Sequence, residues 1–145
     1  MRRGEIGEAE PSAVQRGTRI SVEDLFYNVP ARRKFLRAER TEFKHVDQLL
    51  RRFALARFDV GFELEHNGKN VSALPPADDE AGQKLRLKRV MGSEFLEHAI
   101  RIDTERGGIG LSGWVAEPRY NRAQADRQFF FVNGRAIRDR VVAHA

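Results

Sequence analysis

The 145-residue chain has the size of one ordinary domain. Of its residues, 41% are hydrophobic and 32% charged, and this apolar content is higher than is typical of disordered chains. No apolar run approaches the roughly 20 residues of a membrane-spanning helix, and the first residues carry no secretory signal. The absence of cysteine excludes disulfides and thiolate metal sites. We therefore expect a cytoplasmic protein without membrane contact.

The net charge of +5 is unevenly distributed along the chain. Residues 31–57 contain nine cations and three anions, and residues 119–140 contain six arginines and two aspartates. Because two basic blocks interrupt an otherwise acidic chain, they indicate a surface that faces a polyanion. The alternative is a solvated charged helix face, which composition alone does not distinguish.

The first regular pattern occupies residues 17–36, GTRISVEDLFYNVPARRKFL. Alternating Ile20 and Val22 predict a short strand, since side chains on a strand point to opposite faces in turn. Pro30 restricts the preceding residue to extended conformations, so a short basic helix is predicted from Ala31. On composition, the stretch is interpreted as a buried strand-to-helix corner.

The clearest predicted helix runs over residues 41–58. Thr41 is a suitable N-cap, and Glu42 in the first turn suits the helix dipole. Leu55 lies off the apolar face and is expected to pack against another element. The apolar face, at about 100° per residue, consists of Phe43, Val46, Leu49, Leu50, Phe53, Ala54 and Ala56.

The rest of the chain alternates short strands with a further helix. Asn67-Gly68 and Asn133-Gly134 are predicted turns, because Asn and Gly tolerate the positive φ of tight hairpins. Asp139 is a suitable cap for a helix that begins at Arg140. The predicted elements are strands at 60–65, 70–74, 100–102, 109–115 and 129–132 and a helix through 83–91.

Several short motifs occur together in this chain. The longest is DLFYNVPARRKFL at 24–36, which follows Gly17-Thr18. The others are TEF at 41–43, ALARFDV at 54–60, HNGK at 66–69, FVNGR at 131–135, RDR at 138–140 and HA at 144–145. From about Gly17 to its last residue, the chain thereby resembles the MutL/HexB family of DNA mismatch repair proteins.

The resemblance implies two parts. Residues 1–18 would be the tail of an N-terminal ATP-binding domain or a disordered lead, and residues 19–145 a C-terminally incomplete transducer domain. That domain has the ribosomal protein S5 domain 2-like fold, which is α+β, with a mixed, mostly antiparallel sheet and helices on one face. Because ribosomal and topoisomerase domains share this fold, an RNA-binding or topoisomerase-type transducer domain is the alternative. A self-contained phosphotransferase or nuclease is disfavoured, since no carboxylate cluster is recognisable.

The family couples ATP-driven dimerisation to DNA binding and to the recruitment of repair partners. Its catalytic glutamate, magnesium-binding asparagine and Asp-Gly-x-Gly loop have no counterpart in this sequence. We therefore expect no catalytic residue, metal ligand or cofactor in this chain, with ATP and Mg²⁺ belonging to a full-length parent that is a weak ATPase. The implied partners are duplex and single-stranded DNA bound without sequence preference, a MutS-type mismatch recognition protein, a downstream repair nuclease or helicase, and a second copy of the parent.

The resemblance also implies two sets of site residues. Gly17 and Thr18 match a nucleotide-contacting motif of the family's ATP-binding domain. Arginines elsewhere match a positively charged groove, where cations neutralise phosphates without reading bases. Arg32 and Arg33 could instead lock their helix to the sheet. The candidate DNA-binding residues are Arg140, Arg135, Arg138, Arg37, Arg32 and Arg33.

We predict that this chain neither hydrolyses ATP nor binds it measurably, because Gly17-Thr18 would form only one edge of a nucleotide pocket. Calorimetry with a non-hydrolysable ATP analogue and a phosphate-release assay measure the two properties. Saturable binding in the micromolar range would contradict the prediction.

Overall fold

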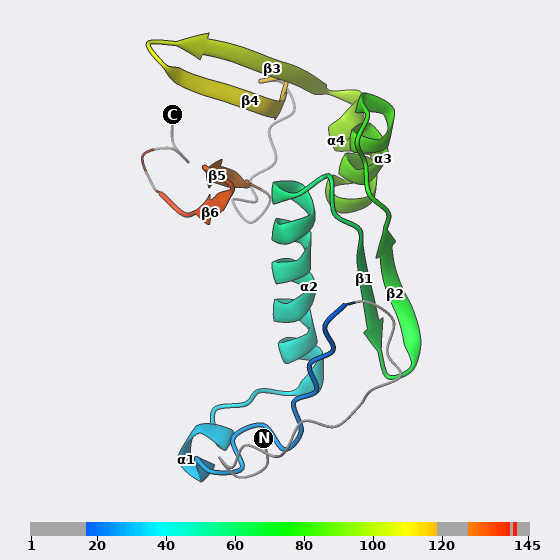
Figure 1. Ribbon diagram of the computed structural model, residues 1–145, viewed down its shortest axis with the longest axis vertical. Coiled ribbons are helices and arrows are strands. Elements are labelled where there is room, and N and C mark those ends of the chain that lie inside the picture. The colour runs from blue at the N-terminus through cyan, green and yellow to red at the C-terminus, as the bar shows by residue number, and fades with distance from the viewer. Residues whose placement is uncertain (1–16, 119–127, 140, 142–145) are drawn as a thin grey trace. The chain divides into compact units, whose positions relative to one another are not determined.

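The computed structural model describes residues 17–118, 128–139 and 141 (Figure 1). The chain divides into two compact units, Met1–Glu42 and Phe43–Ala145, and the boundary falls inside a helix. None of the helices in the described part of the chain is both long enough and apolar enough to cross a membrane.

The described part of the first unit contains one short helix. Helix α1, Pro30–Arg33, follows Val29, whose backbone (φ −136°, ψ 69°) is neither helical nor fully extended, and Pro30 occupies the first turn, where its missing N–H is not needed. The strand predicted from Ile20 and Val22 is wrong, because residues 18–23 form no regular structure and these two side chains are 82% and 73% exposed. Two alternating apolar residues do not hold a strand without a partner strand to pair with.

The predicted buried corner is wrong as well, since Asp24–Tyr27 forms an exposed turn. The Tyr27 N–H donates to the Asp24 carbonyl at 2.8 Å, and the Val29 N–H donates to the Phe26 carbonyl at 3.1 Å. Phe26 is half-buried, whereas Leu25 and Tyr27 are more exposed. The turn saturates its backbone locally, so these apolar side chains need no buried surroundings to be positioned.

Helix α2, Glu39–Ala56, begins before the predicted start at Thr41. The Ala38 carbonyl accepts the N–H groups of both Thr41 and Glu42, so Thr41 lies inside the helix and is not its cap. The Glu42 carboxylate reaches back to accept the Arg37 N–H at 2.9 Å. An acidic side chain in the first turn thus satisfies a backbone donor just before the helix, and it also suits the helix dipole.

The described strands form three antiparallel hairpins, and the fold is α+β as predicted. Each hairpin is a two-stranded sheet, whereas the sequence suggested a single sheet. Asn67, Gly68, Asn133 and Gly134 all have positive φ, as predicted for the two Asn-Gly turns. The pairs are β1, Phe62–His66, with β2, Lys69–Leu74; β3, Ala99–Arg106, with β4, Ile109–Ala116; and β5, Phe130–Val132, with β6, Arg135–Ile137.

Two helices separate the first hairpin from the second. Helix α3, Glu80–Met91, starts three residues earlier than predicted, because the Asp79 carboxylate caps it by accepting the Gly82 N–H at 2.7 Å. Gly92, with φ of 101°, ends α3 as predicted and precedes α4, Ser93–Glu97. An extended conformation with positive φ is open to glycine and strained for other residues.

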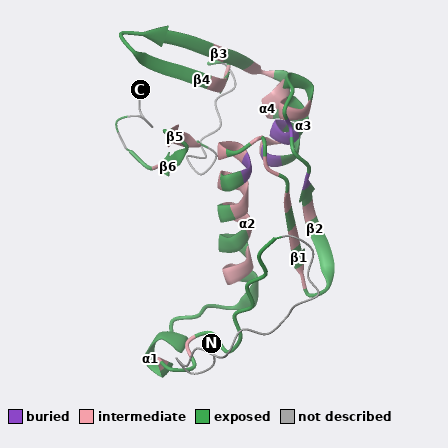
Figure 2. Cartoon of the chain, in the orientation of Figure 1, coloured by how far each residue is buried: buried purple, intermediate pink, exposed green. Residues whose placement is uncertain are grey.

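A small core in the second unit joins α2, β2 and α3 (Figure 2). Its buried members are Ala54, Leu74 and Val90, and Leu55 packs against them, as expected for a residue off the main apolar face of α2. Val46, Leu49 and Phe53 of that face are about half exposed. The predicted apolar face of α2 is therefore wider than the surface that the hairpin and α3 cover.

A buried arginine connects the elements around this core. Arg86 on α3 is 2% exposed, and its guanidinium lies 5.6 and 5.9 Å from the ring centres of Phe58 and Phe62. Burial lowers the pKa of Arg86, and the charges of Asp59 and Asp78 oppose that effect. The guanidinium donates hydrogen bonds to the carbonyls of Ala54, Arg57, Val60, Leu74 and Pro75.

We predict that Arg86→Met lowers the free energy of unfolding by at least about 3 kcal/mol, since each buried carbonyl left without a donor costs about 1–3 kcal/mol. Urea-induced unfolding followed by circular dichroism measures the loss. The matched control is Arg89→Met on the same helix, which removes one exposed bond to the Ala73 carbonyl. Equal losses for the two variants would contradict the prediction.

Candidate nucleic-acid interface

Cations cluster where the first unit passes from α1 toward α2. Arg32 and Arg33 form the last turn of α1, and Lys34 and Arg37 follow it. All four are exposed, and within the described part of the chain their side chains make no hydrogen bond or ion pair. We call residues 32–37 the α1 cluster. Its charged groups are therefore available to an external anion.

The turn that leads into α1 has an unusual backbone. Asp24 and Phe26 have φ of 49° and 65°. Positive φ is tolerated by Asp but is an outlier for a bulky aromatic residue, because the Cβ atom approaches a carbonyl oxygen. The turn orients the chain for Pro30 and the α1 cluster while holding Phe26 in a strained conformation.

The second group of candidate residues lies on the β5–β6 hairpin. Arg135 is the first residue of β6, pairs with Val132 across the hairpin and follows the turn at Asn133-Gly134. Arg138 comes just after β6, and both arginines are exposed. The Asp139 carboxylate accepts the Val141 N–H at 2.8 Å, which suits the predicted capping role. Arg140 and the helix predicted from it lie outside the described residues.

Other arginines are held by the protein itself. Arg57 pairs with Asp59, which raises the pKa of Arg57 and lowers that of Asp59 chiefly through their hydrogen bonds. Arg101 lies near Glu80 and Asp103, at 3.7 and 3.6 Å. The arginines bonded within the described structure are Arg51, Arg57, Arg86, Arg89 and Arg101. None of the predicted DNA-binding residues that the structure describes is among these.

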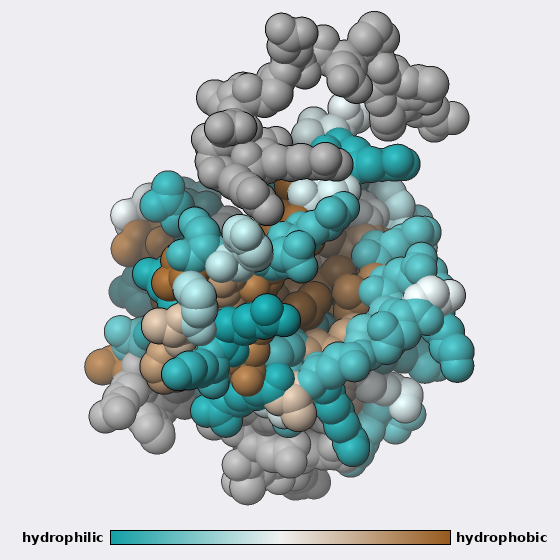
Figure 3. All heavy atoms as spheres, turned by 90° about the horizontal axis from the view of Figure 1, so that it is seen from below, coloured by the Kyte–Doolittle hydropathy of each residue, from teal (hydrophilic) through white to brown (hydrophobic). Residues whose placement is uncertain are grey.

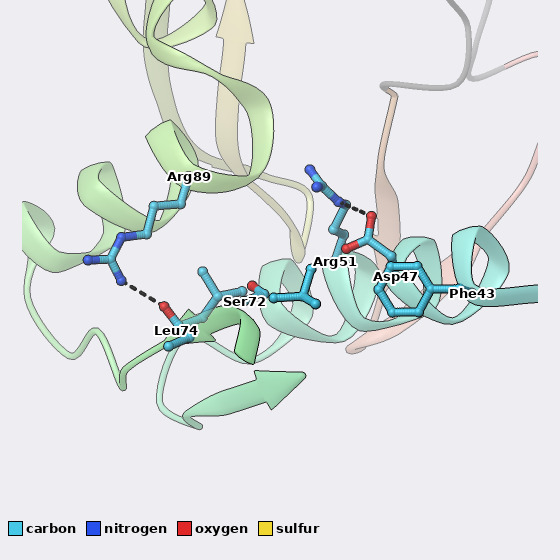
Figure 4. Close-up of a pocket in the computed structure, with 8 residues that line it drawn as sticks. Phe43, Asp47, Arg51, Ser72, Leu74 and Arg89 are labelled. Carbon is cyan, nitrogen blue, oxygen red and sulfur yellow. Dashed lines mark hydrogen bonds and ion pairs between the residues drawn. The ribbon is translucent and has the colours of Figure 1, made fainter. Parts of the chain in front are cut away.

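A hollow of about 370 Å³ lies between α2 and β2 (Figure 4). Phe43, Asp47 and Arg51 line it from α2, and Arg89 approaches from α3. Arg51 is bonded to Asp47 at 2.8 Å and to the Val90 carbonyl at 2.9 Å, while Arg89 bonds the Ala73 carbonyl at 2.8 Å. These bonds join α2, β2 and α3, so the polar groups at the hollow serve the fold.

The structure places the predicted site residues in different parts of the chain. Gly17 and Thr18 lie in exposed, irregular backbone of the first unit, which also holds the α1 cluster. Arg135 and Arg138 belong to the second unit. No group of three potential metal ligands is found among the described residues.

The sequence did not lead us to expect the burial of Arg86 or the exposure of Phe35. Arg86 received no role, although helical spacing puts it beside Leu87 and one turn before Val90 on the buried face of α3. Phe35 belongs to the stretch interpreted as a buried corner, but it is among the most exposed large apolar residues described. Figure 3 shows such apolar atoms at the surface between polar side chains.

Comparisons with known proteins bear on this geometry. Residues 87–145 match a family model described as "DNA mismatch repair protein, C-terminal domain". The DNA mismatch repair proteins MutL of Pseudomonas putida (strain GB-1) and Pseudomonas entomophila (strain L48) are 55% and 56% identical over 136 residues. These matches cover 94% of this chain and 22% of each relative, so the chain spans about a fifth of their length.

A solved structure agrees with the sequence matches. The MutL ATPase domain of Aquifex aeolicus, complexed with ADP, matches with a TM-score of 0.65 and 29% identity. The match covers 83% of this chain and 44% of the Aquifex chain. Together, the α+β fold and the sequence matches place this chain in the class of DNA mismatch repair proteins. The chain belongs to the MutL family.

The strained turn yields a prediction. Phe26→Gly should unfold with a free energy about 1 kcal/mol higher than Phe26→Ala, because glycine adopts positive φ without the Cβ penalty. Thermal and urea unfolding of the two variants measure the difference. Leu25 lies in the same turn without positive φ, and there the order should reverse, with Leu25→Gly less stable than Leu25→Ala. The same order at both positions would contradict the strained conformation.

Proposed function

We propose that this chain is the part of a MutL-type mismatch repair protein that binds DNA without sequence preference through exposed arginines. The observation that carries the proposal is the division among its arginines. Arg32, Arg33, Arg37, Arg135 and Arg138 are exposed, and their side chains are unbonded within the described part of the chain, while another set stabilises the fold. Unbonded guanidinium groups can neutralise phosphates and release counterions at little structural cost.

The proposed contacts require no base readout. Arginine donates up to five N–H groups and pairs with phosphate oxygens in a bidentate manner. Phosphate oxygens are the same in every sequence, so these contacts position the protein without selecting a sequence. Arg140 is proposed as a further phosphate contact on the basis of its RDR motif.

The parent protein is proposed to couple ATP-driven dimerisation to DNA binding and to the recruitment of a MutS-type protein and a downstream nuclease or helicase. The sequence relatives are named as the DNA mismatch repair protein MutL, and the structure of the Aquifex MutL ATPase domain is a complex with ADP. We propose that ATP and Mg²⁺ bind the parent, with Gly17 and Thr18 at one edge of the nucleotide, and that this chain alone is not an enzyme. The transducer assignment of residues 19–145 is likewise a proposal, and the family match at 87–145 lies inside it.

We predict that Arg135→Ala lowers the magnitude of the salt slope, log K against log[salt], by about 0.9 on duplex DNA, as expected for one lost phosphate contact. Arg135→Glu and Arg140→Glu should lose more affinity than the alanine variants, because they add repulsion. The losses should be similar for unrelated sequences. Fluorescence anisotropy with labelled duplexes at several salt concentrations measures the slope.

The matched control is Arg101→Ala, which removes an arginine already paired with Glu80 and Asp103. It should change the salt slope little. A thermal melt of each variant separates loss of binding from loss of folding. Unchanged DNA affinity in folded Arg135→Glu and Arg140→Glu would refute the proposed site, and competition by RNA stronger than by DNA would favour the RNA-binding alternative.

A further inference from the structure

The α1 cluster contains an exposed aromatic ring among its cations. Phe35 is 81% exposed and lies between Lys34 and Leu36 in a segment with four cations and no anion, residues 31–37. Its N–H donates to the Arg32 carbonyl at 3.0 Å, so a hydrogen-bonded turn ties its backbone to α1. The ring is thus held next to groups that attract phosphate.

The chemistry of this arrangement matches one class of ligand. Proteins that bind single-stranded nucleic acid combine cations that follow the backbone with aromatic side chains on which bases stack. In duplex DNA the bases are already stacked on each other, and an aromatic side chain at the phosphates does not reach their faces. We propose that Phe35 is a base-stacking residue through which the α1 cluster binds unpaired, single-stranded DNA. This inference rests on the proposed DNA-binding function and assigns a base contact that the arginines do not supply.

An acidic protein surface would also complement the charge of the α1 cluster. Such a partner would accept any apolar side chain of similar size at position 35, whereas base stacking needs a π face. Leucine retains much of the apolar surface of phenylalanine and lacks the ring. The variant Phe35→Leu therefore separates the two kinds of contact, and Phe35→Tyr should restore stacking.

The experiment measures the affinities of the 145-residue chain for three probes of about 16 residues or base pairs. These are an oligothymidylate, an abasic deoxyribose-phosphate strand of the same length, and a duplex. Phe35→Leu should weaken oligothymidylate binding by about 5- to 150-fold, as for the loss of one stacked base. Its affinities for the abasic strand and the duplex should stay within about twofold of wild type, because they depend on phosphate contacts.

Phe35→Tyr should bind oligothymidylate as wild type does. The matched control is Ile20→Ala, which trims an apolar side chain of similar exposure, 82%, in the same unit and should change no affinity. A second measurement uses Phe35→Trp combined with Trp114→Phe, since Trp114 is the single tryptophan of the chain. Its fluorescence should be quenched by oligothymidylate and not by the abasic strand.

Three results would overturn the inference. They are unchanged oligothymidylate affinity in Phe35→Leu, an equal loss on the abasic strand, or a lower melting temperature with unchanged DNA affinity, which would place Phe35 in a packing role. If wild type still binds the duplex in any of these cases, the proposed DNA-binding function is retained and only the base contact of Phe35 is refuted. Failure of wild type to bind all three probes would instead refute the proposed function and the base contact with it.

Discussion

The hydrogen bonds of Arg86 hold together the best-packed part of the second unit. A helix ends with carbonyls that have no partner in the helix itself, and the Ala54 carbonyl in the last turn of α2 is of this kind, while the Arg57 carbonyl lies just after the helix. The same guanidinium also bonds the carbonyl of Leu74 at the end of β2. Because Arg86 belongs to α3, one side chain fixes the ends of two elements to a third.

The choice of arginine at this position follows from geometry. A guanidinium is planar and presents its donors in fixed directions, whereas an ammonium is a compact point charge with three donors. Burying a charge is costly unless hydrogen bonds compensate it, and here carbonyl oxygens and the two aromatic rings of Phe58 and Phe62 surround it. The small apolar core, with Ala54, Leu74 and Val90 as its buried members, thus depends on a polar centre.

The arginines of this chain therefore serve two purposes. One set of arginines lies at the core and on α2, α3 and β3, and these side chains bond carbonyls or carboxylates of the protein itself. Those of the α1 cluster and the β5–β6 hairpin are exposed and hold no such partner within the described residues. For a member of the MutL family, this division separates the residues that maintain the fold from those proposed to meet DNA. The strained Phe26 turn and the exposed Phe35 ring lie next to or within the α1 cluster, so in the first unit the unusual backbone geometry and the proposed DNA contact fall in one short segment.

Features that depend on local backbone preferences could be predicted from the amino-acid sequence. The Asn67-Gly68 and Asn133-Gly134 turns, the start of α1 within one residue of its predicted position at Ala31 and the end of α3 at Gly92 each follow from the φ angles that these residues allow. The family motifs likewise indicated which arginines are candidates for DNA binding.

Which side chains are buried and which groups bond them depends on the packing of the folded chain. Ile20 and Val22 alternate like a strand yet pair with nothing described, and Phe35 looks like a core residue yet is exposed. Arg86 looks like a surface cation, but it is buried because carbonyls far apart in the sequence converge on it. Burial and hydrogen-bond partners are properties of pairs of segments, and one segment's pattern does not contain its partner. The separation of structural from unbonded arginines therefore became visible only in the folded chain.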